Sequence, residues 1–161
     1  MDILIHPSPA LKQRAHEVDP ASDPDIPRLV QAMAKAMYAA PGVGLAATQV
    51  GVQKRVFVFD VDDGLVAVCN PVLTDYSEET EADEEGCLSL PGLTVTVERP
   101  SSVVCEGLDL KGSPLRIESD GLLARLLQHE TDHLEGVLIL DRATPEERRA
   151  AMKRYRELAE G

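Results

Sequence analysis

Two histidines four residues apart, at the ends of the pentad His129 to His133, constrain this chain more than any other feature. One turn of α-helix stacks residues i and i+4 on the same face, so both imidazoles can reach a single metal ion. Glu130 stands beside them, where a carboxylate could take a proton from water bound to that ion. The pentad therefore predicts a helix that carries a metal site.

The residues around the pentad predict the same helix without the histidines. Asp120 is a suitable N-cap, and Gly136 is a typical stop signal. Between them, leucines recur at helical spacing at positions 122, 123, 126 and 127. We expect a largely apolar, central helix. The pentad alone would also fit a histidine that is buried and hydrogen-bonded without metal.

A third metal ligand is needed, and Cys87 is the best candidate among the three cysteines. Gly86 and Gly92 flank it, as expected where backbone turns tightly or passes close to another group. Cys69 and Cys105 lie in valine-rich stretches and are expected to be small buried hydrophobes. Three ligands from cysteine and histidine leave one tetrahedral position open for water, which is typical of a catalytic site.

Three motifs of the chain resemble the signature motifs of the peptide deformylases, in the order and at the spacing of that family. They are GVGLAATQ at 42–49, EGCLS at 85–89 and QHETDH at 128–133. The stretch from Gly121 to Arg142 and the N-terminal helix also look like that family. The resemblance therefore covers nearly the whole chain.

The resemblance implies a metal-dependent hydrolase that removes the formyl group from the N-terminal formylmethionine of new polypeptides and releases formate. The metal would be held by Cys87, His129 and His133, and would lower the pKa of its water. Glu130 would take the proton from that water and return it to the leaving amine.

The resemblance also implies which groups bind the oxyanion and which metal is present. The metal, the Leu88 N–H and the Gln49 side chain would hold the oxyanion, and a neutral amide suits this task because it donates without adding charge. Cysteine and histidine ligands alone would suggest zinc. The family implies ferrous iron first, with zinc or nickel as substitutes.

The neighbours of the metal site are expected to select the substrate. Leu126, one turn before His129, is placed with Val43 to line a pocket for the methionine side chain, and plain core packing is the alternative for Leu126. Gly44 belongs to the glycine-rich stretch against which a substrate strand can lie.

Two positions depart from the pattern of the family. Arg125 shares a helix face with His129, where relatives usually carry an apolar residue. Thr94 stands where the family often places a larger residue that touches the peptide. These departures leave open a deformylase with a specialised N-formyl substrate.

The acidic run from Glu78 to Glu85 is expected to be a solvated loop, because it lacks the fixed spacing of a calcium-binding loop. Glu85 is the exception. In the deformylases a glutamate in this motif pairs with a downstream arginine, and Arg99 is the candidate partner here. An ordinary surface charge is the alternative for Arg99.

The order of the predicted elements indicates an α+β fold, with short antiparallel strands around the central metal-bearing helix, an N-terminal helix and a C-terminal helix. The segment through Pro27 is expected to be irregular, followed by a helix at 28–40. Asp62 to Gly64 is a hairpin signal between the first two strands. Strands are expected at 55–60, 65–70, 93–98, 103–108 and 115–117.

Length and composition limit the class of protein. The 161 residues are expected to form one catalytic domain, 1–161. With 16 basic and 28 acidic residues the net charge is −12, which argues against DNA binding. The chain has no apolar run near 18 residues and no leader-like start, so we expect no membrane span and a cytoplasmic location. An odd number of cysteines without a framework fits a reducing compartment.

The C-terminal segment predicts a last helix, because Thr144 to Glu147 reads as N-cap, N1 proline and capping box. Its apolar side is expected to consist of positions 152, 155 and 159. Arg149, Lys153 and Arg156 form a basic stripe at helical spacing. The resemblance implies that such a helix can dock near the ribosomal exit, and a solvated face balanced by glutamates is the alternative.

Two further classes compete with a deformylase. A zinc peptidase would share the pentad but usually takes a third histidine or a glutamate as ligand, against which Cys87 in its motif argues. A metal-binding or ribosome-associated module without activity would need a damaged site. Every expected catalytic position is intact.

Overall fold

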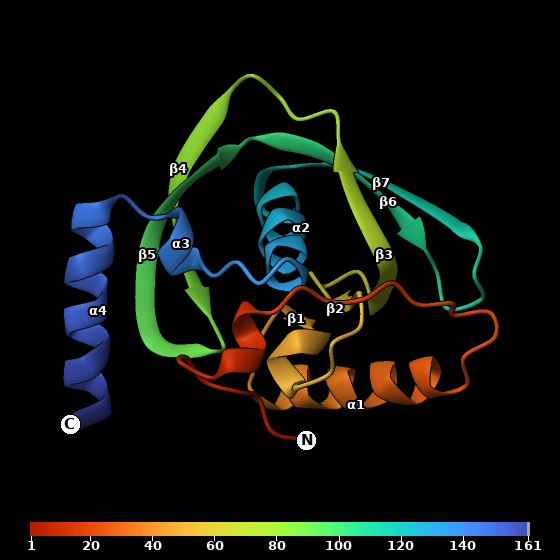
Figure 1. Ribbon diagram of the computed structural model, residues 1–161. Coiled ribbons are helices and arrows are strands. Elements are labelled where there is room, and N and C mark those ends of the chain that lie inside the picture. The colour runs from red at the N-terminus through yellow and green to blue at the C-terminus, as the bar shows by residue number, and fades with distance from the viewer. Residues whose placement is uncertain (161) are drawn as a thin grey trace.

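The computed structural model describes residues 1–160, with helix α2 at the centre of the molecule and strands on several sides of it (Figure 1). The elements in chain order are η1 (Pro9–Lys12), α1 (Asp25–Ala39), β1 (Gly44–Ala46), η2 (Ala47–Val50), β2 (Val56–Phe59), β3 (Val66–Thr74), β4 (Thr80–Cys87), β5 (Leu90–Pro100), β6 (Ser102–Leu108), β7 (Pro114–Asp120), α2 (Gly121–Leu134), α3 (Ile139–Arg142) and α4 (Pro145–Glu160). The predicted α+β architecture is confirmed.

The strands form two antiparallel sheets. One has five strands in the order β1-β2-β3-β6-β7, and the other is a ribbon of β4 and β5. The predicted hairpin joins β2 to β3, where Phe59 pairs with Val66. Its turn requires unusual backbone, since Asp62 and Gly64 both have positive φ. Glycine reaches that region without steric cost, and aspartate tolerates it better than most residues.

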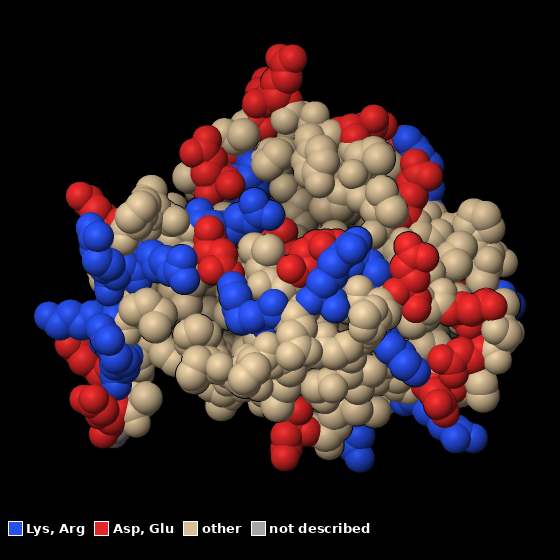
Figure 2. Space-filling model, in the orientation of Figure 1, with Lys and Arg blue, Asp and Glu red and all other residues tan. Residues whose placement is uncertain are grey.

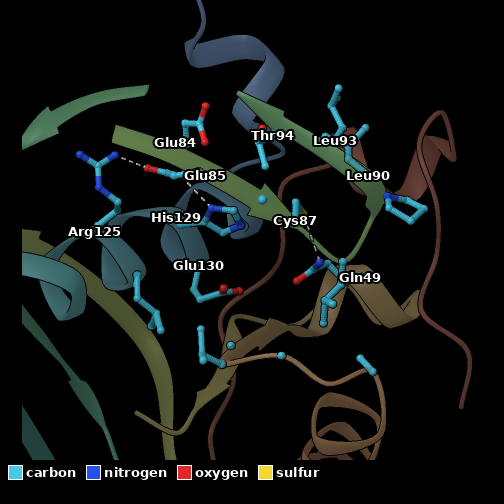
Figure 3. Close-up of a pocket in the computed structure, with 18 of the residues that line it drawn as sticks. Gln49, Glu84, Glu85, Cys87, Leu90, Leu93, Thr94, Arg125, His129 and Glu130 are labelled. Atoms are coloured by element: carbon cyan, nitrogen blue, oxygen red, sulfur yellow. Dashed lines mark hydrogen bonds and ion pairs between the residues drawn. The ribbon is translucent and has the colours of Figure 1, made fainter. Parts of the chain in front are cut away.

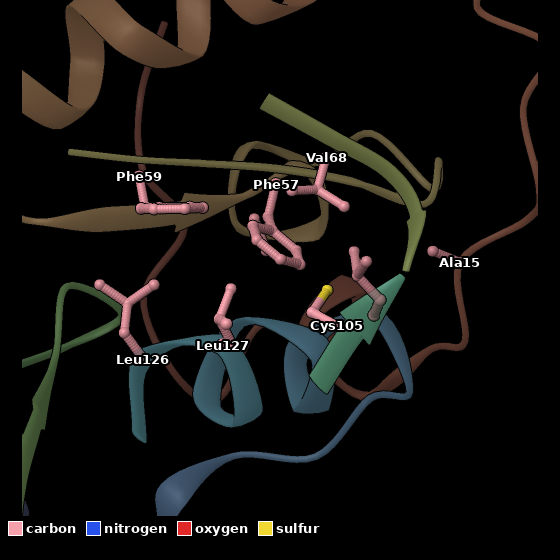
Figure 4. Packing of buried hydrophobic residues seen from close by; sticks show 9 residues of the cluster. Ala15, Phe57, Phe59, Val68, Cys105, Leu126 and Leu127 are labelled. Carbon is pink, nitrogen blue, oxygen red and sulfur yellow. The ribbon is translucent and has the colours of Figure 1, made fainter. Parts of the chain in front are cut away.

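The core between α2 and the five-stranded sheet consists of the residues that α2 presents at helical spacing and the inward side of the strands (Figure 4). Leu126 and Leu127 of α2 pack in one cluster with Phe57, Val68 and Cys105. The expected burial of both valine-flanked cysteines is confirmed, because neither Cys69 nor Cys105 is more than 1% exposed. This packing fixes α2 and the side chains that it carries.

The N-terminal helix α1 covers the other side of the strands near β1 and β2 (Figure 1). It begins at Asp25, so the prediction of irregular structure through Pro27 is wrong by three residues. Proline is tolerated in the first turn of a helix, where its missing N–H would have no partner in the helix. Its buried face consists of residues at helical spacing, namely Ile26, Val30, Met33, Ala34 and Met37.

Strand β4 corrects the reading of the acidic run as a loop. Its backbone pairs along its length with β5, from Thr80 opposite Pro100 to Gly86 opposite Thr94. Most of its side chains face solvent, whereas Glu85 is buried. Backbone pairing with β5 holds this strand, so it needs no buried apolar face. Its sequence therefore lacks the apolar–polar alternation by which a strand is recognised.

Helix α4 begins as predicted, because the Thr144 hydroxyl accepts a hydrogen bond from the Glu147 N–H at 3.2 Å. Its apolar side differs from the prediction. Position 159 is exposed, and Ala151, one turn before the buried Tyr155, packs against β5 instead. The Tyr155 hydroxyl also donates to the His6 carbonyl. Within residues 1–160 no helix combines the length and apolar character that crossing a membrane requires.

Candidate metal centre

Three side chains from two distant parts of the chain meet at the end of β4, and Figure 3 shows two of them, Cys87 and His129. Cys87 ends that strand, and His129 and His133 lie one turn apart on α2. The ligand atoms of the three lie within 4.8 Å of one another. The Nε2 atom of His133 is 3.4 Å from the Cys87 sulfur and 3.2 Å from His129 Nε2. The sequence-predicted ligands are thus brought together around one point.

The imidazole of His129 is oriented by the buried carboxylate of Glu85, whose Oε1 lies 2.9 Å from His129 Nδ1. Burial alone would raise the pKa of Glu85, but hydrogen bonds from His129 and Arg99 outweigh it and lower that pKa to about 2. An ionised carboxylate can only accept, so the proton belongs on His129 Nδ1. The Nε2 lone pair then faces the other two ligands, as metal-binding histidines require.

Arg99 holds Glu85 in the way that the sequence predicted. Its Nε donates to Glu85 Oε2 at 2.6 Å and its Nη2 to Oε1 at 2.9 Å, in a two-pronged contact with both side chains buried. Such paired contacts fix geometry as well as charge. The alternative of a surface charge for Arg99 is wrong.

The pairing continues to Asp132, which the sequence reading did not single out. Arg99 Nη1 donates to Asp132 Oδ2 at 3.0 Å, and Arg142 contacts both oxygens of the same carboxylate. Asp132 lies inside the pentad, and its position beside His133 was the available signal. Through these ion pairs Asp132 links α2 to Arg99 on β5 and to Arg142 on α3.

Glu130 is buried, 4% exposed, beside the three ligands. Burial raises its pKa to about 7. Its Oε1 has no hydrogen-bond partner within the described chain. Gly44 makes room for it, since a Cβ at Gly44 would lie 2.7 Å from Glu130 Oε2. A carboxyl group that titrates near neutrality is suited to moving a proton.

Gln49 reaches the same point from η2. Its Oε1 accepts from the Ala46 N–H, which fixes the amide so that Nε2 faces the Ser89 hydroxyl at 3.1 Å and the Cys87 sulfur at 3.6 Å. Leu88 follows Cys87 in the turn from β4 to β5. The predicted oxyanion-binding residues therefore both adjoin the ligand cluster.

A cavity of about 750 Å³ opens onto this cluster. The predicted substrate residues line it, and so do Thr94 and the unpredicted Leu122, which is 67% exposed at α2. The sequence counted Leu122 among the apolar repeat of the helix, and a leucine in such a repeat gives no separate signal that it lines a cavity. The predicted residues in the wall are Val43, Gly44, Leu126 and Arg125.

The donor set fits a divalent metal ion. A thiol and two imidazoles are the ligands that zinc and other borderline-soft ions prefer, and one face of the cluster opens to the cavity. A histidine buried only for packing would be expected to bond its ring nitrogens. Instead, His133 Nδ1 has no hydrogen-bond partner in the described part of the protein. Its Nε2 faces the Cys87 sulfur and His129 Nε2, the other two atoms that could bind the ion.

Comparisons with known proteins agree along the chain. The model of the polypeptide deformylase family matches residues 1–149. A peptide deformylase of Pelotomaculum thermopropionicum is 50% identical over 133 residues, which cover 83% of this chain and 84% of that protein. The crystal structure of a Legionella pneumophila peptide deformylase superposes with a TM-score of 0.92 at 36% identity, over 99% and 95% of the two chains. A Synechococcus elongatus peptide deformylase, solved in complex with actinonin, superposes with a TM-score of 0.90 at 37% identity, over 96% and 86%.

Proposed function

The chain belongs to the polypeptide deformylase family, and we propose that Cys87, His129 and His133 hold the metal ion with which it performs the reaction of that family. That reaction is removal of the formyl group from an N-terminal methionine. The observation that carries the proposal is the cluster of these three side chains at the edge of a cavity whose wall includes Cys87, His129 and Glu130. When bound there, a divalent ion would polarise the formyl carbonyl and lower the pKa of a water molecule.

Glu130 is the proton carrier in this proposal. Its carboxylate takes the proton of the attacking water and gives it to the amine that leaves, so that formate and a free methionine amino group result. Its burial supports the role, because a pKa of about 7 lets the group accept and release a proton at neutral pH. Glu85 and Arg99 keep His129 oriented during this exchange.

Gln49 and the Leu88 N–H bind the oxygen on which negative charge develops. Donors fixed before the reaction stabilise such charge without reorganising. The bond from Ala46 to Gln49 supports this role, since it holds the amide in place. Val43, Gly44 and Leu126 form the wall beside the methionine side chain.

Ferrous iron is the metal that we propose for the working enzyme, with zinc or nickel as replacements. Family membership supports iron, whereas the thiol and imidazole donors accept all three ions. Anaerobic removal of the metal should abolish formate release, and ferrous iron should restore more of it than zinc. Equal recovery with zinc would contradict this choice of metal.

The experiment that tests the proposed function compares formate release from formyl-Met-Ala-Ser with cleavage of the unformylated peptide. We expect release of formate and no peptide cleavage, together with about one metal ion bound per chain. In Glu130→Gln the metal should remain while kcat falls by roughly 10² to 10⁴-fold. Wild-type turnover in that variant would exclude Glu130 as the proton carrier.

The partners and location follow from the substrate. Nascent formylated chains appear at the ribosome, so we propose a cytoplasmic enzyme that docks there through α4. Basic side chains gather over this helix in Figure 2, and Arg149, Lys153 and Arg156 are all exposed. A deformylase with a specialised N-formyl substrate is the second candidate function, favoured by the presence of Arg125 in the cavity wall.

A further inference from the structure

The side chain of Arg125 bridges α2 and the β4–β5 ribbon beside the cavity (Figure 3). Its Nη1 donates to Glu85 Oε2 at 2.5 Å and to the Val97 carbonyl at 2.9 Å. Its Nη2 donates to the Glu81 carbonyl at 2.8 Å. The side chain is only 12% exposed. Three acceptors on two strands therefore fix the guanidinium, whose planar fork suits several simultaneous bonds.

Arg125 shares the buried carboxylate of Glu85 with Arg99. Glu85 receives Arg125 and Arg99 on Oε2, and Arg99 and His129 on Oε1, so that each oxygen faces two donors. Arg99 shares its own charge with Asp132. A cation that is already paired has little to offer an incoming substrate as an ion. What Arg125 adds to the cavity wall is its alkyl stem.

We propose that Arg125 is a specificity-determining residue, whose anchored stem forms a fixed wall that limits the width of the side chain accepted next to the formyl group. The inference rests on the proposed function, since it concerns the first residue of the substrate, whose amino group carries the formyl group. Arg125 lies one turn before His129, and Leu122 and Leu126 line the cavity from the same helix. A wall held at three points cannot yield to a wide ring, whereas an unbranched thioether side chain can pass along it.

Arg125→Ala tests the wall directly, with formyl-Met-Ala-Ser and formyl-Phe-Ala-Ser as substrates. Removing the stem should raise KM for the methionine peptide and lower the ratio of kcat/KM for methionine over phenylalanine by about tenfold, within the range that one pocket contact gives. Arg125→Met keeps a stem of similar length without its anchors. It should lower the ratio by about threefold, because the wall can then move.

The matched control is Arg55→Ala. Arg55 is equally buried, and it binds the Leu134 carbonyl and Glu135 at the opposite end of α2. It does not belong to the cavity wall. Arg55→Ala should lower the melting temperature and leave the methionine-to-phenylalanine ratio unchanged. This control separates selectivity from a general loss of stability.

The outcomes distinguish the role of Arg125 from the proposed function. Absence of formate release from both peptides in the wild-type holoenzyme would contradict the function. Dissociation constants of the two formylated peptides for Glu130→Gln, with and without Arg125→Ala, still report selectivity without turnover. A ratio that stays within twofold in both Arg125 variants, by rate and by binding, would overturn the inference.

Discussion

Gly44 and Glu130 occupy adjoining space so closely that a Cβ on the glycine would lie 2.7 Å from a carboxylate oxygen. β1 therefore approaches α2 at a point where only hydrogen fits between backbone and side chain. The sequence predicts that the substrate strand lies against the backbone of the glycine-rich stretch. Its contact with Glu130 adds a second requirement for glycine at the same position.

Gly44→Ala should displace the Glu130 carboxylate and lower kcat by roughly 10 to 100-fold, as small displacements of reacting groups do. Metal content should be unchanged, because no ligand is touched. Gly42→Ala is the matched control, since its Cβ would meet only the flexible end of the Leu88 side chain, at 2.8 Å. Full activity in Gly44→Ala would show that this contact does not hold Glu130.

Alkylation should distinguish Cys87 from the other two cysteines. Burial raises the pKa of Cys69 to about 11 and that of Cys105 to about 12, so both remain thiols near neutrality. The thiolate is the form that reacts. Metal-free protein should therefore take up one equivalent of iodoacetamide at about pH 8, at Cys87, and added metal should slow the reaction. Mass spectrometry locates the label. Labelling of Cys87 at the same rate with metal bound would argue against Cys87 as a ligand.

The Glu85 carboxylate should make stability depend on pH. Its pKa is lowered from 4.5 to about 2, so its contribution to stability is present above pH 4.5 and is lost as pH falls toward 2. Glu85→Gln should reduce the free energy of unfolding by about 3 kcal/mol at neutral pH, because two buried arginines lose their shared partner. The difference from wild type should shrink below pH 4.5.

Denaturant titrations at several pH values measure this difference. Glu84→Gln is the control, because Glu84 is the neighbour on the same strand and is exposed. It should change stability by less than about 0.5 kcal/mol. A Glu85→Gln protein that unfolds like wild type at neutral pH would contradict the stabilising role of this carboxylate.

Reversing the charges of Arg149, Lys153 and Arg156 to glutamate should weaken salt-sensitive co-sedimentation with ribosomes and leave hydrolysis of a short formylated peptide nearly unchanged. Arg28→Glu, Lys35→Glu and Lys111→Glu, three reversals at exposed positions outside α4, control for net charge. Unaltered co-sedimentation would favour a merely solvated face. Loss of short-peptide activity would mean that α4 supports the fold.

The sequence was most informative where local pattern and chemistry coincide. Helix α2 carries capping, stop and ligand signals within one short segment, and the structure places it as predicted, from Gly121 to Leu134. Asp120 occupies the N-cap but does not bond the helix through its side chain. Gly136 has positive φ at the end of the helix, as a stop residue should.

Contacts between distant segments carried no such signal. β4 is a strand because β5 lies beside it, and its own side chains are mostly exposed acids. Likewise, Arg125 donates to the backbone carbonyls of Glu81 and Val97. Every residue has a backbone carbonyl, so the residue types at these positions do not predict the contacts. Pattern therefore singled out the three side chains that cluster, whereas the arrangement around them depended on tertiary structure.

Cys87 and His133 are 46 positions apart in the chain, yet their ligand atoms meet at 3.4 Å. A ribosome making this protein therefore completes Cys87 well before it adds the second histidine. No growing copy can assemble its own reaction centre until the segment through α2 has been synthesised and packed against β4. In a cell that formylates its initiator methionine, a copy that has not yet been extended through α2 therefore depends on a finished molecule for removal of its own formyl group.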